Sequence, residues 1–130
     1  MVTGAAVKKQ MDGELNLQDE QMIVMNAADM LIDIYTAEAL LLRVSELKKA
    51  GYEKLETTES VLRVFLHDAT FRMRRNATDA VTVFSSGDLL KTFSMGIKRF
   101  TGYPPQNVSL LRKSIADLVI SEDKYPFRMV

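Results

Sequence analysis

Cysteine is absent from the 130 residues, so the chain can form neither disulfides nor thiolate metal sites. His67 is the one histidine, which excludes paired-histidine zinc sites and makes any histidine-based catalytic triad depend on that residue. The glycines show neither G-x-G-x-x-G nor P-loop spacing, so we expect no nucleotide cradle. Acidic and basic residues balance at 17 each, and a net charge of zero gives little support for nucleic-acid binding.

Long hydrophobic runs are also missing. The first ten residues have no apolar core of signal-peptide length, and no stretch approaches the length of a membrane span. The expected location is therefore the cytoplasm. A chain of this length fits one domain, residues 1–130.

What the sequence does contain is helical periodicity, strongest from about residue 18 to 50. Apolar residues recur there at steps of four and three: Ile23, Ala27, Met30, Ile34, Ala37, Leu41 and Val44. A second row lies on an adjacent face: Val24, Ala28, Leu31, Tyr35 and Leu42. So wide an apolar surface needs neighbours on two sides, and any uncovered part must face solvent or another chain. We expect the first row to be buried, so that Ile34→Asp unfolds the isolated domain.

The same spacing predicts the other elements. The second long helix has a buried row of Leu62, Phe65, Ala69, Met73, Ala80 and Val83, with Asn76 either at its edge or hydrogen-bonded inside. The predicted fold class is all-α: an antiparallel bundle of four main helices, at about 18–50, 59–84, 88–101 and 108–121, plus a short N-terminal helix over residues 2–11. Residues 124–130 are expected to form a tail.

Local signals predict where these helices end. Expected N-caps are Asn16, then Thr57 or Thr58, and finally Asn107, with Asp19 and Glu20 in the first turn of the long helix. Expected glycine stops are Gly13, Gly51 and Gly102. Gly96 inside a helix costs roughly 1 kcal/mol relative to alanine, which favours close approach to another helix. The helix over 2–11 has no cap, so we interpret the chain as a fragment of a longer protein.

Polar residues on these helices give no active site. His67 is interpreted as a surface or boundary histidine, because its neighbour Asp68 points about 100° away on a helix. Asp29 and Asp33 share a helix face with Asn26 and Thr36 that is interpreted as solvated, and Glu38 as partly exposed. The cluster of Arg63, Arg72, Arg74 and Arg75 is expected to meet acids of the first long helix or of a partner subunit. No catalytic, cofactor-binding or metal-binding residue is assigned.

Two separated stretches resemble a known family. The segment MIVMNAADMLIDIYTAEALLLRV (residues 22–44) resembles the C-terminal helical domain of long bacterial acyl-CoA dehydrogenases. The segment SSGDLLKTFSMGIKRFTGYPPQNVSLLRKSIADLVI (residues 85–120) is similar to the end of the same domain. The resemblance implies a parent flavoenzyme that uses FAD to remove hydrogens from Cα and Cβ of fatty acyl-CoA thioesters in β-oxidation and passes electrons to an electron-transfer flavoprotein. The family's catalytic base and flavin contacts lie in upstream domains, so this fragment alone is expected to have neither enzymatic activity nor FAD.

The resemblance implies two roles. The first is packing against the upstream dehydrogenase domains of the same chain, or against a second copy in a homo-oligomer. The second is weak membrane contact through the residues Lys91, Phe93, Lys98, Arg99 and Phe100. Without the resemblance, the alternative is a free-standing helical adaptor that binds a partner helix in a groove.

Overall fold

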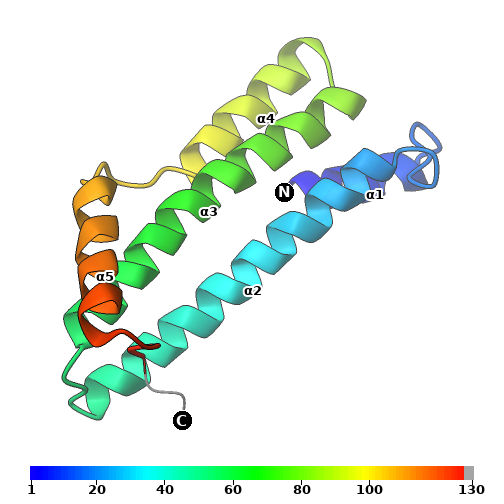
Figure 1. Cartoon of the computed structure of the whole chain (residues 1–130). Helices are drawn as coiled ribbons and strands as arrows, with labels where there is room; N and C mark the ends of the chain where they lie inside the picture. The colour runs from blue at the N-terminus through cyan, green and yellow to red at the C-terminus, as the bar shows by residue number, and fades with distance from the viewer. Residues whose placement is uncertain (128–130) are drawn as a thin grey trace. The chain divides into compact units, whose positions relative to one another are not determined.

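The computed structural model describes residues 1–127. Within this range the chain forms five α-helices: α1 (Val2–Met11), α2 (Gln21–Lys49), α3 (Leu55–Phe84), α4 (Gly87–Phe100) and α5 (Val108–Glu122) (Figure 1). No strand occurs in the described part, so the all-α prediction is confirmed. The last three residues of the predicted tail, 128–130, lie outside the described residues. None of the helices in that range is long and apolar enough to cross a membrane.

The helix starts differ from the sequence prediction in two places. Asn16 closes a tight turn instead of capping α2: its Oδ1 accepts from the Gln18 amide at 3.1 Å and its Nδ2 donates to Asp19 at 2.6 Å. The helix therefore begins only at Gln21, and its first turn contains no acidic residue. The α3 helix begins four residues earlier than predicted, at Leu55. Thr58 consequently lies inside α3, where its hydroxyl donates to the Lys54 carbonyl at 2.9 Å.

Other end signals were read correctly. Asn107 caps α5, since its side chain accepts from the Leu110 amide at 3.1 Å. Gly13 and Gly51 follow α1 and α2 with φ values of 74° and 65°, the left-handed conformation that glycine adopts without a Cβ penalty. Gly102 is the exception: it follows the C-cap residue of α4, Thr101, but its φ is not positive, so it does not end the helix through the left-handed conformation.

The chain divides into two compact units. Unit 1 contains Met1–Ile34 and Ala69–Tyr103, and unit 2 contains Tyr35–Asp68 and Pro104–Val130, described up to residue 127. Each of the two long helices belongs to both units: the first part of α2 and the last part of α3 lie in unit 1, and the rest of both helices lies in unit 2.

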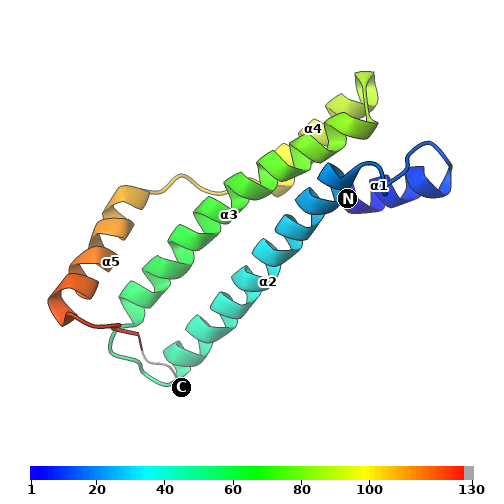
Figure 2. The same ribbon diagram turned by 45° about the vertical axis from the view of Figure 1, so that its right-hand side comes forward.

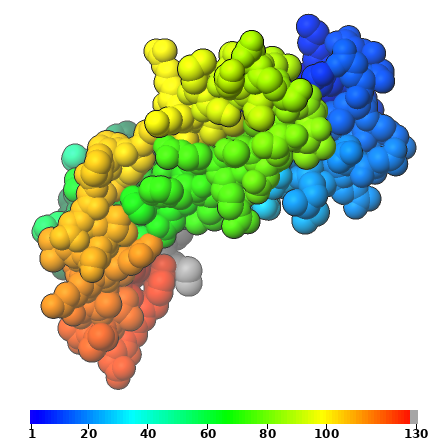
Figure 3. All heavy atoms as spheres, turned by 90° about the horizontal axis from the view of Figure 1, so that it is seen from above, coloured from blue at the N-terminus to red at the C-terminus, as the bar shows by residue number. Residues whose placement is uncertain are grey.

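Unit 1 has a core of small and β-branched side chains from four helices. Its buried apolar residues are Val2, Ala6, Ile23, Ala77, Ala80, Val81 and Ile97. Phe84 and Phe93 pack against this core, and their two rings meet edge to face with centroids 5.8 Å apart. Figures 1 to 3 show α4 running back alongside the C-terminal half of α3. Gly96 of α4 lies under the Met1 side chain: a Cβ there would meet Met1 Cε at 3.0 Å and Sδ at 3.1 Å. The predicted close approach at Gly96 therefore involves the side chain of Met1.

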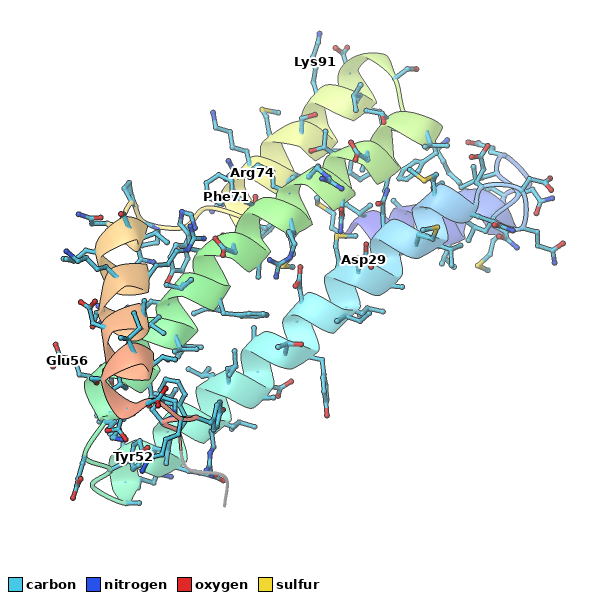
Figure 4. The ribbon with its side chains drawn as sticks, in the orientation of Figure 1. Asp29, Tyr52, Glu56, Phe71, Arg74 and Lys91 are labelled. Carbon is cyan, nitrogen blue, oxygen red and sulfur yellow. The ribbon has the colours of Figure 1, made fainter. Side chains whose placement is uncertain are left out.

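Unit 2 is a helical hairpin of α2 and α3 with α5 and the following segment. Val44 and Leu62 are buried in it, whereas α5 has no fully buried residue. Polar contacts hold the end of α5: Lys54 Nζ lies 2.7 Å from Glu122 Oε1, and the Tyr52 hydroxyl donates to the Pro126 carbonyl at 3.3 Å (Tyr52 is labelled in Figure 4).

Candidate functional site

The polar side of α2 is only partly solvated: Asp29 is exposed as predicted, but Asn26 and Asp33 are buried. Asp33 is only 8% exposed and pairs with Arg72 of α3, whose Nη2 lies 2.6 Å from Oδ1 and whose Nε lies 3.2 Å from Oδ2. The interpretation of Asp33 as an outward-facing acid is therefore wrong. The expectation that the arginine cluster meets acids of the first long helix is confirmed for Arg72, whereas Arg75 pairs with Asp79 of its own helix and Arg74 with Thr101. A two-point guanidinium–carboxylate pair fixes the orientation of both side chains, so it specifies how α2 meets α3 within unit 1.

The polar residues around this pair differ in burial. Asp29 is exposed and, with Arg72, Arg75 and Asn76, lines a polar hollow of about 280 Å³. Asn76 is buried, with 6% of its surface exposed. Glu38 is exposed, as are most of the carboxylates of α2. Among the described residues, no group of three or more histidine, aspartate or glutamate side chains has the arrangement of a metal site.

Asn26 is a second polar residue on the buried side of α2. It is 8% exposed, and its Nδ2 atom has no hydrogen-bond partner within the described range. A buried donor without an acceptor costs free energy, whereas an apolar side chain of similar size at the same place does not.

We therefore expect Asn26→Leu to raise the free energy of unfolding by about 1 kcal/mol, because it removes the unsatisfied amide. Urea unfolding followed by circular dichroism measures this. A clear loss of stability would mean that the amide has a partner, such as a buried water.

Arg74 holds the end of α4. Its Nε donates to Thr101 Oγ1 and its Nη2 to the Thr101 carbonyl, both at 2.9 Å. The guanidinium also lies over the Phe71 ring, 5.8 Å from the centroid. Figure 4 shows Arg74 and Phe71 next to each other on α3. Arg74 thus supplies positive charge and hydrogen bonds to the C-terminus of α4, where both are stabilising.

His67 and Asp68 form a boundary cluster in unit 2. Although they are neighbours in sequence, His67 Nδ1 lies 3.1 Å from Asp68 Oδ1. Arg112 of α5 donates to both oxygens of Asp68 at 2.8 Å. The His67 hydrogen bond first, and then Arg112, lower the pKa of Asp68. The cluster attaches α5 to α3.

This cluster predicts a pH-dependent contribution to stability. Because the pKa of Asp68 is lower in the folded chain, its contribution is present above the ordinary aspartate pKa and is lost as pH falls through the lowered value. The stability difference between the wild type and Asp68→Asn should therefore shrink between about pH 5 and pH 2. Urea midpoints measured across this range test the expectation, and a difference independent of pH would contradict it.

The feature with the clearest potential for interaction is the outer face of α2, defined as the second apolar row: Val24, Ala28, Leu31, Tyr35 and Leu42. In unit 1 Leu31 is 63% exposed, and in unit 2 Tyr35 and Leu42 are 75% and 60% exposed. Isolated exposed apolar residues are normal, but several on one helix face are typical of an interaction site. The exposed Glu38 separates Tyr35 from Leu42 in this row. The row was visible in the sequence, but its exposure was not.

An apolar pocket of about 350 Å³ lies beside this face in unit 1. Its walls come from the first three residues and from α2, α3 and α4: Met1, Val2, Thr3, Ala27, Met30, Leu31, Ile34, Met73, Ala77, Ile97, Phe100 and Thr101. Ile34 is 48% exposed at this pocket, so its predicted burial is wrong. Sequence reasoning missed the pocket because it joins segments that are far apart in the chain.

These features describe an all-α protein with exposed apolar residues on one helix face. A family model described as "Acyl-CoA dehydrogenase, C-terminal domain" matches residues 1–99, so the chain belongs to this family. This assignment confirms the resemblance read from the two sequence stretches.

Two relatives support the assignment. A probable acyl-CoA dehydrogenase of Bacillus subtilis (strain 168) is 25% identical over 107 residues, which are 82% of this chain and 18% of that protein. The crystal structure of an acyl-CoA dehydrogenase complexed with FAD from Bacillus anthracis matches with a TM-score of 0.85 and 27% identity, over 95% of this chain and 21% of that chain. The chain thus spans about a fifth of the length of each relative.

Proposed function

We propose that the chain is the C-terminal accessory domain of a longer FAD-dependent acyl-CoA dehydrogenase and that its own role is packing rather than catalysis. The parent enzyme would oxidise fatty acyl-CoA thioesters between Cα and Cβ in the cytoplasm and pass electrons to an electron-transfer flavoprotein. FAD would be held by the upstream domains. The family description and the small share of each relative that the chain covers support this reading.

The observation that carries the packing role is the uncovered outer face of α2. Leu31, Tyr35 and Leu42 each keep more than half of their surface in water. Burying such side chains contributes about 1.5–3 kcal/mol each, so a partner that covers them gains substantial stability. The partner we propose is the upstream part of the same chain, with contacts to a second copy of the enzyme as a further site of packing.

The test compares three proteins: the isolated chain, the longer gene product, and that product truncated before Met1. We expect the longer product to contain flavin and to reduce an artificial electron acceptor in the presence of a fatty acyl-CoA. The isolated chain should do neither, and the truncated product should lose thermal stability or assembly. Turnover of an acyl-CoA by the isolated chain would contradict the proposal, as would a longer product without flavin.

Membrane contact is a second candidate, favoured by one end of α4. Met95 and Phe100 are 67% and 77% exposed there, next to the basic residues Lys98 and Arg99. Lys91 (labelled in Figure 4) is exposed, but its Nζ pairs with Asp88 Oδ1 of the same helix at 2.9 Å, and Phe93 packs on the core and does not contribute. Co-sedimentation with anionic liposomes at low salt tests this candidate, and failure of both the chain and the longer product to sediment would exclude it.

A further inference from the structure

The apolar pocket of unit 1 is open where two large side chains meet the solvent. Leu31 of α2 is 63% exposed and Phe100 of α4 is 77% exposed, and both line the pocket. Its floor is formed by buried core residues, among them Ala77 and Ile97. Both the floor and the rim of the pocket are therefore apolar.

The chemistry of the lining selects an apolar occupant. The polar side chains in the lining are those of Thr3 and Thr101. The Thr101 hydroxyl is already engaged, because it donates to the Ile97 carbonyl at 2.7 Å and accepts from Arg74 Nε at 2.9 Å. A polar or charged ligand would lose its hydrogen bonds with water and find few partners in the pocket. An aliphatic or aromatic side chain has no such hydrogen bonds to lose.

The position of the N-terminal residues indicates where the occupant comes from. Met1, Val2 and Thr3 form part of the pocket wall, and the Met1 side chain packs over Gly96 of α4. In a longer protein, a segment that precedes Met1 in the sequence is attached next to the pocket. A short tether gives such a segment an effective concentration on the order of millimolar, far above that of a second copy or a free ligand.

We propose that this pocket is a socket for apolar side chains of the dehydrogenase segment that precedes Met1 in the longer protein. The inference rests on the proposed function, since it needs an upstream segment. It adds a defined docking position, at Leu31 and Phe100, to the general packing role of α2.

Single-cysteine labelling tests this directly, because the 130 residues contain no cysteine. Leu31→Cys places a thiol at the rim of the socket. Met25→Cys is a matched control on the same helix: Met25 is 60% exposed and does not line the pocket. Both variants are made in the longer protein and in the isolated chain, and labelling by a maleimide is quantified on the α2 peptide by mass spectrometry.

In the isolated chain the two thiols should react at similar rates. In the longer protein we expect the thiol at position 31 to react at least about tenfold more slowly, while the thiol at position 25 changes much less. Equal rates at position 31 in both proteins would overturn the inference. Leu42→Cys separates the two proposals, because Leu42 lies on the outer face of α2 but does not line the pocket. Protection at position 42 without protection at position 31 would overturn the socket and leave the packing role standing, so the two failures are distinguishable.

A photo-crosslinking residue at position 31 of the longer protein identifies the occupant. A crosslink to a peptide upstream of Met1 in the same polypeptide supports the socket. A crosslink to α2 or α4 of a second copy would overturn it in favour of an interface between copies. Loss of protection after delipidation, without any peptide crosslink, would overturn it in favour of a bound fatty-acyl ligand.

Discussion

Arg72→Met is expected to lower the free energy of unfolding of this chain by about 3 kcal/mol, because it leaves a buried carboxylate without its partner. The side chain of Asp33 is only 10% exposed, so little water solvates this carboxylate in the fold. Because the arginine itself is half exposed, the expected loss of unfolding free energy is at the lower end of the range for breaking buried ion pairs. Urea unfolding monitored by circular dichroism measures the change.

The double variant Asp33→Leu/Arg72→Met separates loss of the pair from loss of packing. If the penalty comes from the orphaned carboxylate, the double variant should regain most of the stability that Arg72→Met loses. Arg75→Met is the matched control, since Arg75 is 81% exposed and lies 4.0 Å from Asp79 of its own helix. Arg75→Met should change the free energy of unfolding by no more than about 0.5 kcal/mol. Equal losses for both single arginine variants would contradict the assignment.

Val81→Asp should unfold the chain. Val81 is completely buried in the core of unit 1, and an unpaired carboxylate there costs several kcal/mol, a large share of the stability of a small domain. Thermal unfolding should show no cooperative transition above about 25 °C.

The same substitution at Ile34 should be tolerated, which reverses the expectation from the sequence. Ile34 is 48% exposed, so Ile34→Asp should cost about 1 kcal/mol or less. If Ile34→Asp unfolds the chain, Ile34 is buried as the sequence predicted, which would contradict the structure.

The number and approximate extent of the helices could be predicted from apolar spacing alone. The buried row of α3 was right for Leu62, Ala69 and Ala80, which are buried, but wrong for Val83, which is 42% exposed. Periodicity succeeded there because the apolar residues of α3 occupy a limited sector of the helix.

On α2 the apolar residues cover so much of the circumference that spacing does not identify the buried side. The structure turns Asn26 and Asp33 inward and leaves Ile34 and Leu41 exposed. The decisive interaction is the pair with Arg72, which lies 39 residues further along the chain. Residue spacing within one helix carries no information about such a partner.

Helix ends were predictable at glycines that take the left-handed conformation, and at Asn107. Asn107 caps α5, because its side-chain oxygen accepts from the Leu110 amide. Asn16 has the same chemistry, but the turn that precedes α2 uses both of its side-chain atoms. The socket in unit 1 was beyond prediction, because its lining combines the N-terminal residues with three separate helices.

The central claim is that the outer face of α2 packs against the upstream part of a longer dehydrogenase. Sedimentation velocity of the isolated chain mixed with the separately purified upstream portion tests it most directly. We expect a complex that forms with the wild-type chain and is lost with Leu31→Glu/Tyr35→Glu/Leu42→Glu, a variant that changes only residues more than half exposed. A chain that remains monomeric and shows no affinity for the upstream portion would contradict the account.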